Sequence, residues 1–274
     1  MYQTVTRTSC KLLTTVATTA FPQPQELHAS TDLTVLFTIS GFLLLLIGLG
    51  CLELVKKKRR RQAAAFCCLL PIFIGLLLAS APALTAWRSR KAQKAAVKAY
   101  LAYAASMEGA AAEQAYQNAA IYNLALAESR GESRYDDLPN DDFVIAALEL
   151  PAIGQTLPVY PGMGTYALRH GAGLLPESSL PIGGLGTHAV FIGCSGLLHA
   201  ELFTDLDAFR EGNILYIHIL DKTLAYQVDS SYTIAAADIS FPIMPDMDQI
   251  TLVTSYENGA YFLVHGVRVA GDTP

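Results

Sequence analysis

The hydrophobic and polar positions divide the chain into two parts with different patterns. In the N-terminal third, residues 33–54 and 63–87 form two long apolar runs, the first with a single charge near its end and the second with none. About 20 apolar residues in helical form are enough to span the hydrocarbon core of a bilayer. The pattern therefore predicts a hairpin of two transmembrane helices.

The residues that flank these runs predict an orientation. The connection at 55–62 contains the sequence KKKRRR, and positive charge concentrates in the cytoplasmic loops of membrane proteins. The connection is therefore expected to be cytoplasmic, while the N-terminal tail, residues 1–32, and everything after Trp87 are expected outside the cytoplasm. The predicted localisation is the cell membrane, with two spans and an extracellular C-terminal domain.

Two shorter regions join the apolar hairpin to the rest of the chain. Residues 88–129 are rich in Ala, Leu and Glu, which favour helix, and Gly109 is a candidate break. A long helix or a helical pair is expected there. Residues 130–142, RGESRYDDLPNDD, combine charged residues with Gly, Pro and Asn and predict a linker or surface loop.

From residue 143 to residue 271 the pattern changes to short apolar runs separated by turn residues, such as FVIAALEL, HAVFIG, NILYIHIL and ITLVTS. Seven or eight runs at this spacing predict a closed or sandwiched β domain. One helix is expected within LLHAELFTDLDAFREG, because its apolar residues recur on one helical face and a glycine follows at the expected C-terminal cap. These residues are Leu202, Phe203, Leu206, Phe209 and Gly212.

Charge and cysteine content narrow the chemistry of the β domain. From Phe143 onward there are 13 acidic and 4 basic residues. A nucleic-acid partner is not expected, because phosphate binding needs clustered positive charge. Of the five cysteines only Cys194 falls in this domain, and a single thiol can form neither an internal disulfide nor a structural zinc site. No metal or other cofactor is predicted.

Four segments of the β domain carry a family pattern. They are LELPAIGQTLPVYPG from residue 148, LRHGAGLLPESSLPIGGLGTHAVFIGCSGLLHAELFTDLD from residue 168, TLAYQVD from residue 223 and TLVTSYENGAYFLVHGVRV from residue 251. In these segments the chain resembles the class C sortases, the pilin-polymerising branch of the Gram-positive sortase family. The resemblance extends from Leu148 to Val269. It implies a mainly β fold, an eight-stranded β-barrel preceded by helices, displayed on the cell surface.

The resemblance also implies where the catalytic residues of an active member would lie. Active sortases use a histidine, a nucleophilic cysteine and an arginine, and the matching positions here are Cys194, Ser255 and Tyr261. In the family reaction a thiolate attacks the Thr-Gly amide of a sorting signal, and an amine then resolves the acyl-enzyme. All three catalytic positions are therefore substituted in this chain.

The substituted residues lack the properties that the reaction requires. Ser255 is a weak nucleophile without a neighbouring base, and the thiol of Cys194 does not replace an imidazole. Tyr261 can donate one hydrogen bond but lacks the fixed charge and forked donors of arginine. Without the resemblance, the same residues would be interpreted structurally, as a buried small side chain, a strand-end turn residue and a strand aromatic.

Other histidines could in principle replace the missing base. His188 precedes Cys194 on the same strand by six residues, on the order of 20 Å, and His265 lies roughly 13 Å beyond Tyr261. Both are expected to be out of reach. His199 follows Cys194 across a turn and is the one histidine expected to approach, although a position at the start of the predicted helix explains it structurally.

Two features of the class C branch have no clear counterpart. The Asp-Pro-aromatic lid that covers the active site is not matched in AESRGESRYDDLPNDDF, residues 127–143. The C-terminal membrane anchor of the branch is not matched either, and the N-terminal hairpin is expected to replace it. A missing lid agrees with the loss of the reactive thiol that it would guard.

Three functions remain open at this stage. The first is a catalytically degenerate protein that acts as a binding or assembly partner of a sorting-signal peptide, a pilin or an active sortase. The alternative is an active transpeptidase or hydrolase that uses Ser255 or Cys194 as its nucleophile. The third is a membrane structural protein in which the barrel is a spacer. Substitution of the whole catalytic set within retained framework segments favours the first.

Overall fold

The computed structural model describes residues 41–43, 46, 61–128, 143–196, 202–256 and 259–269. The predicted N-terminal tail, the polar linker and His199 lie outside the described residues, as does almost all of the first predicted transmembrane helix.

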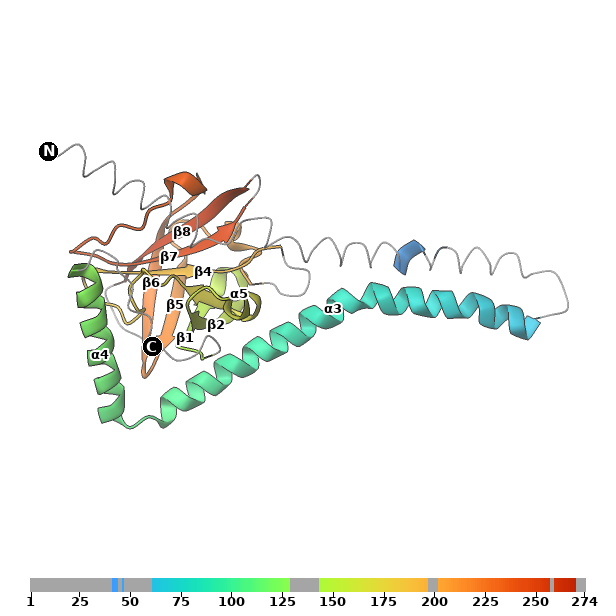
Figure 1. Ribbon diagram of the computed structural model, residues 1–274, viewed down its shortest axis with the longest axis horizontal. Helices are drawn as coiled ribbons and strands as arrows, with labels where there is room; N and C mark the ends of the chain where they lie inside the picture. Colours follow the sequence, from blue (N-terminus) through green and yellow to red (C-terminus); the bar gives the residue numbers. More distant parts are fainter. Residues whose placement is uncertain are drawn as a thin grey trace.

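Eight strands form a closed barrel in the order β1-β2-β3-β4-β7-β8-β6-β5 (Figure 1). The pairs β2–β3 and β4–β7 are parallel, and the other neighbours are antiparallel. The strands are β1 Ala146–Leu150, β2 Gln155–Pro161, β3 Ala172–Leu174, β4 Thr187–Ile192, β5 Ile214–Ile219, β6 Lys222–Ala235, β7 Asp248–Ser255 and β8 Ala260–Arg268. The predicted eight-stranded β-barrel is confirmed.

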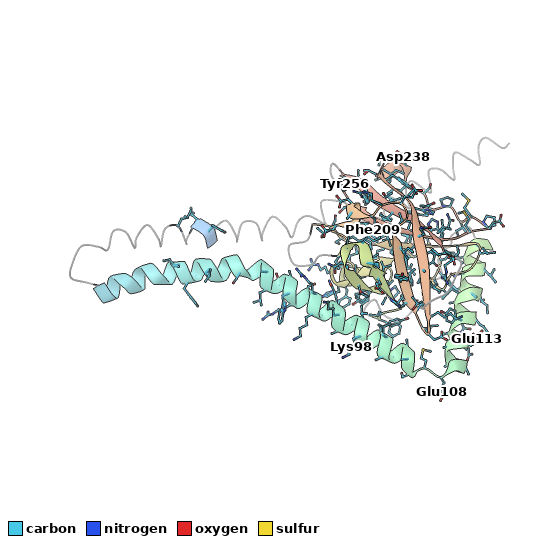
Figure 2. The ribbon with its side chains drawn as sticks, turned by 180° about the vertical axis from the view of Figure 1, so that it is seen from behind. Lys98, Glu108, Glu113, Phe209, Asp238 and Tyr256 are labelled. Atoms are coloured by element: carbon cyan, nitrogen blue, oxygen red, sulfur yellow. The ribbon has the colours of Figure 1, made fainter. Side chains whose placement is uncertain are left out.

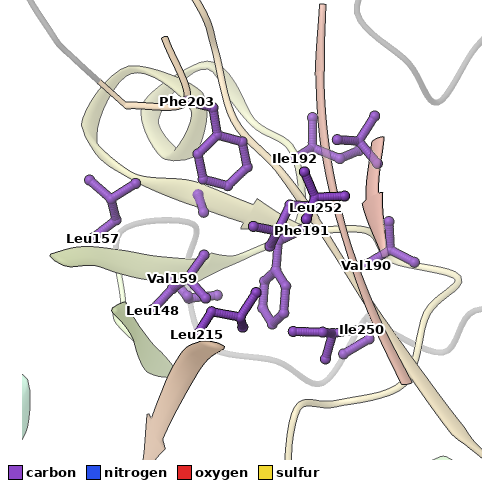
Figure 3. Packing of buried hydrophobic residues seen from close by; sticks show 14 of the residues in the cluster. Leu148, Leu157, Val159, Val190, Phe191, Ile192, Phe203, Leu215, Ile250 and Leu252 are labelled. Carbon is purple, nitrogen blue, oxygen red and sulfur yellow. The ribbon is translucent and has the colours of Figure 1, made fainter. Parts of the chain in front are cut away.

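The barrel interior is filled by aliphatic and aromatic side chains from nearly every strand. Figure 3 shows Leu148, Val159 and Phe191 among the side chains that converge there, and all three are fully buried. Burial of one such side chain stabilises the fold by about 1.5–3 kcal/mol. The short apolar runs of the sequence are therefore the strands of one shared core.

Two long helices precede the barrel. In Figure 1 the second stands along the left side of the barrel, and the first runs beneath the barrel and extends away to the right. The helices are α3 Arg61–Ser106 and α4 Gly109–Glu128, so the predicted helical region and its break near Gly109 are confirmed. Two tyrosines attach these helices to the β5–β6 turn: the Tyr100 hydroxyl accepts a hydrogen bond from the Leu220 amide at 2.9 Å, and the Tyr116 hydroxyl donates one to the Ile219 carbonyl at 3.2 Å.

The second apolar run, residues 63–87, is the N-terminal part of α3, which continues without interruption into the segment that contacts the barrel. Among the residues that the structure describes, no helix is found that is both long enough and apolar enough to cross a membrane. The two predicted spans are thus not confirmed, and they remain a prediction from the sequence.

The helix predicted within LLHAELFTDLDAFREG, of which residues 197–201 lie outside the described residues, is not an α-helix where the structure describes it. Residues 202–205 form a turn, and only a single turn of 3-10 helix follows, η3 Leu206–Ala208. A hydrogen bond of 3.0 Å from the Phe203 amide to the Cys194 carbonyl ties the turn to the end of β4. All four apolar side chains of the expected helical face are fully buried, because 3-10 and turn geometry also bring residues three apart onto one side.

The remaining short elements lie in loops between strands. They are η2 Pro151–Ile153, α5 Thr165–His170 and η4 Ala236–Asp238. Of these, α5 lies beside β2 and β3.

The contact between α4 and the β3–β4 loop yields a stability prediction. Asn123 is buried, its amide donates to the Leu180 carbonyl at 3.0 Å, and its side-chain oxygen accepts from the Leu180 amide at 2.7 Å. Asn123→Ala leaves the Leu180 amide without its partner, whereas the Leu180 carbonyl keeps its hydrogen bond from the Ile182 amide. Because a buried donor is then unsatisfied, we expect the free energy of unfolding to fall by about 2 kcal/mol. Urea denaturation measures this change. Asn118, exposed on the same helix, is the matched control, and an equal loss in Asn118→Ala would contradict the assigned role.

Candidate functional site

The parallel pairing of β4 with β7 brings together residues that are about 60 positions apart. The register places Ile192 beside Val253. Two hydrogen bonds continue the pairing past the end of β4: the Gly193 amide donates to the Val253 carbonyl at 3.1 Å, and Thr254 Oγ1 donates to the Gly193 carbonyl at 2.8 Å. Cys194 follows Gly193, and Ser255 follows Thr254. These two positions therefore lie side by side at the same end of the barrel.

The third position is supplied by β8. Tyr261 lies directly opposite Ser255 in the antiparallel β7–β8 pair. Cys194, Ser255 and Tyr261 are each only 3% exposed. The structure therefore brings the three singled-out positions together at the ends of β4, β7 and β8. Tyr256, the residue after Ser255, marks this end of the barrel in Figure 2, far from the α3–α4 corner at Glu108.

Cys194 stands in an environment that keeps its thiol protonated. Burial raises the pKa of this thiol to about 12, and the guanidinium of Arg169 on α5 lowers it only in part. A reactive cysteine needs the opposite arrangement, in which nearby positive charge lowers the pKa of the thiol. At neutral pH, Cys194 is therefore neither a thiolate nucleophile nor a base.

Ser255 is hydrogen-bonded to a second hydroxyl. Ser195 Oγ donates to the Ser255 carbonyl at 2.6 Å and lies 3.2 Å from Ser255 Oγ. A neutral hydroxyl does not remove a proton from another hydroxyl at neutral pH, so Ser195 does not activate Ser255. Ser195 is the site residue that sequence reasoning had not assigned, and its position directly after Cys194 was the signal for it.

Tyr261 completes the set as a neutral donor. Burial raises the pKa of its phenol above the ordinary value, so the hydroxyl carries its proton at neutral pH. The end of the barrel thus presents a thiol, hydroxyls and a phenol, all uncharged. Such a set supplies neither a base nor the fixed positive charge that stabilises an oxyanion.

The end of β4 is held close to the turn that follows it. A Cβ built on Gly193 would lie 2.5 Å from the ring of Phe203, so only glycine permits this packing. The ring is fully buried. The close packing and the hydrogen bond from the Phe203 amide to the Cys194 carbonyl hold the turn at residues 202–205 against the end of β4, beside the candidate site.

Two histidines that sequence reasoning placed out of reach make hydrogen bonds elsewhere on the sheet. His188 Nδ1 donates to the Pro242 carbonyl at 3.0 Å, and His188 Nε2 accepts from Thr251 Oγ1 at 2.8 Å. His265 Nδ1 donates to Asp229 Oδ1 at 2.7 Å. These partners explain both histidines as structural. Across the described residues, no group of three or more His, Cys, Asp or Glu side chains could hold a metal ion.

The sequence and the structure were compared with known proteins. The family model described as Sortase domain matches residues 148–266. A search of curated proteins gave no match.

Solved structures similar to the chain include several sortases. Sortase C of Streptococcus pneumoniae is 34% identical, with 65% of this chain and 98% of that chain covered and a TM-score of 0.59. Sortase C1 of Streptococcus agalactiae is 28% identical, with 66% and 100% covered and a TM-score of 0.61. Clostridium perfringens sortase C, solved with the C-terminal cell wall sorting motif, is 32% identical, with 64% and 98% covered and a TM-score of 0.59.

The burial of His188 predicts an acid-sensitive fold. Burial lowers the pKa of His188 to about 4 in the folded protein, from about 6.5 in the unfolded chain. The unfolded chain then binds the proton more readily, so the stability is complete above pH 6.5 and falls as the pH decreases toward 4, by about 3 kcal/mol. Urea denaturation between pH 4 and 7 measures this loss.

The comparison that isolates His188 uses two variants. His188→Gln should flatten this part of the pH profile, whereas His170→Gln on α5 should leave it unchanged. A profile that is the same in His188→Gln and in the wild type would contradict the assignment.

The environment of Cys194 predicts an unreactive thiol. In the native protein at pH 8, we expect iodoacetamide to label Cys194 at least about a hundredfold more slowly than in urea, because the thiol is both buried and protonated. Mass spectrometry of the peptide that contains Cys194 distinguishes it from the other cysteines. Native labelling as fast as that of the unfolded chain would show an exposed or ionised thiol.

Proposed function

The chain belongs to the sortase family, and from this premise we propose that it is a catalytically degenerate member. In this proposal it takes part in the display of surface proteins or pili by holding a peptide or an assembly partner, and it does not join peptides itself. The observation that carries the proposal is the uncharged set at the converging ends of β4, β7 and β8. In this set the Cys194 thiol is buried, and the hydroxyl of Ser255 has as its partner the hydroxyl of Ser195, which is not a base.

A sorting-signal peptide is the first partner that we propose. The Clostridium perfringens sortase C structure contains a C-terminal cell wall sorting motif, and this chain covers 98% of that protein at 32% identity. The half-buried Ser195 donates its hydroxyl proton to the Ser255 carbonyl, so its oxygen can accept a hydrogen bond from an amide of an extended peptide. A pilin that carries such a peptide, or an active sortase that accepts it, would be a larger partner of the same kind.

The alternative is an active enzyme with atypical residues. A reaction at Ser255 would need a base from a partner chain, and a reaction at Cys194 would need the thiol to ionise against its burial. Removal of even one oxyanion donor costs about 3–4 kcal/mol of transition-state stabilisation, and here the base and the nucleophile are replaced as well. These costs favour binding over catalysis.

A position at the membrane is proposed from the sequence alone. The two apolar runs and the intervening KKKRRR support a membrane anchor that places the barrel outside the cell, where sorting-signal peptides would be met.

The test combines binding and turnover in one preparation. The full-length chain is incubated with a labelled sorting-signal peptide and an amine acceptor. We expect saturable binding of the peptide and no acyl-enzyme, hydrolysis or transfer product by mass spectrometry. Product formation that is abolished by Ser255→Ala or Cys194→Ala would replace this proposal with the alternative.

A gain-of-function variant tests whether the peptide-holding surface is retained. Cys194→His, Ser255→Cys and Tyr261→Arg together restore the residue types of the family at the three positions. A peptide-labelled thiol in this variant is expected if the surface still presents a sorting signal at residue 255. A folded variant that binds no peptide would count against the peptide-holding role.

A further inference from the structure

The second half of β6 is an open strand edge. On one side β8 pairs with β6 from Tyr226 to Ala235. On the other side β5 pairs only as far as Gln227, and the preceding loop adds one residue, since the Val228 amide donates to the Asn213 carbonyl at 2.8 Å. From there to the end of β6, at residues 229–235, the described chain supplies no backbone partner on this side. Figure 2 shows Asp238, three residues past the end of β6, at the end of the barrel far from Glu108 and the α3–α4 corner.

The hydrogen-bond pattern determines which residues face the open edge. The Tyr256 amide donates to the Ala260 carbonyl at 2.8 Å, which makes these two residues a hydrogen-bonded pair between β7 and β8. Residues of an antiparallel strand alternate between the two sides, so the odd-numbered residues of β8 bond to β6. Their partners in β6 are Ser230, Tyr232 and Ile234.

The alternate residues of β6 therefore direct their backbone groups outward. They are Ser231, Thr233 and Ala235, with three N–H groups and three carbonyls. The irregularity between Val228 and Ser230 causes the change, because Val228 still bonds to the β5 side. Ser231 Oγ contacts the Phe209 carbonyl at 3.4 Å, so the loop before β5 ends beside Ser231 and leaves the edge accessible from there on.

The open stretch of this edge has little of the usual protection against pairing, since the irregularity of β6 lies just before it, between Val228 and Ser230. Natural edge strands carry charged residues, proline or a bulge that prevents the addition of another strand. Residues 230–235, SSYTIA, contain no charge and no proline, and they include the strand formers Tyr, Thr and Ile. Thr233 and Ala235 are exposed, and Tyr232 is 44% exposed. An extended segment can therefore reach the open backbone groups.

The charges around the edge indicate the partner. Asp229 and Asp238 lie at its two ends, and both are exposed, although Asp229 Oδ1 also accepts the hydrogen bond from His265 Nδ1. Figure 2 shows Asp238 at the tip of this end of the barrel. Pairing of two copies of β6 in antiparallel orientation would place Asp229 of one copy near Asp238 of the other, and like charges across strands are destabilising. A segment with basic residues at its ends matches the edge instead.

We propose that residues 231–235 of β6 bind an extended segment of a partner protein as an added β-strand. The segment has an uncharged core of strand-forming residues flanked by Lys or Arg. Backbone hydrogen bonds would supply the affinity, as in other β-augmentation complexes, and the exposed ring of Tyr232 would contact a neighbouring side chain. This surface lies two strands away from Ser255 in the order β7-β8-β6, and the proposal does not depend on the proposed function of the strand-end site.

The test uses a fluorescein-labelled peptide of sequence Lys-Thr-Val-Thr-Tyr-Thr-Lys and the full-length chain, followed by fluorescence anisotropy. We expect saturable binding that weakens about tenfold in Thr233→Pro. Proline at this position removes an outward N–H and leaves the hydrogen bonds to β8 intact. Thr233→Val keeps the N–H and should bind as the wild type does, so it is the matched control.

A second measurement covers the case in which Thr233→Pro does not fold. The same peptide, N-methylated at alternate residues, should lose its binding to the wild-type chain. Equal binding by Thr233→Pro or by the N-methylated peptide, or no saturable binding at millimolar peptide, would overturn the proposal. Self-association in sedimentation experiments that is abolished by Thr233→Pro would also overturn it, because the occupant would then be a second copy of the chain.

Discussion

The parallel pairing of β4 with β7 is the contact on which the candidate site depends. Parallel neighbours need a long crossover, and here the crossover comprises η3, β5, β6 and η4. Closure of the barrel places the end of β4 beside the end of β7, and β8 returns antiparallel so that Tyr261 faces Ser255. The close packing of Phe203 on Gly193 holds the following turn against the end of β4.

Burial determines the protonation state and the accessibility of Cys194, Ser255 and Tyr261. The three residues are neutral and almost inaccessible, and the pKa of the Cys194 thiol is raised to about 12. A buried site strengthens hydrogen bonds, but transpeptidation also needs a thiolate, an acid for the leaving amine and a charge for the oxyanion. The framework is that of the sortase family, but with Ser255, Cys194 and Tyr261 at these positions it supplies none of the three.

One end of the barrel carries two unlike sets of hydrogen-bonding groups. The strand ends carry thiol, hydroxyl and phenol side chains. The open edge of β6 carries backbone N–H and carbonyl groups between the exposed carboxylates of Asp229 and Asp238. After the irregularity at Val228, β6 no longer pairs with β5 but still pairs with β8. Because β8 also pairs with β7, the open edge and Ser255 belong to neighbouring strands of one sheet.

The sequence by itself determined the β class and the helical region before the β domain, because strand alternation and helix-forming composition are local signals. The closed eight-stranded barrel and the three singled-out positions followed from the resemblance of its framework segments to the sortases. The apolar pattern gave the wrong element at residues 202–209, since apolar residues three apart fit a 3-10 turn as well as a helix. The Ser195–Ser255 contact, the partners of His188 and the open edge of β6 depend on register between distant strands. Only the tertiary structure decided these, because a shift of one residue in register exchanges the two faces of a strand.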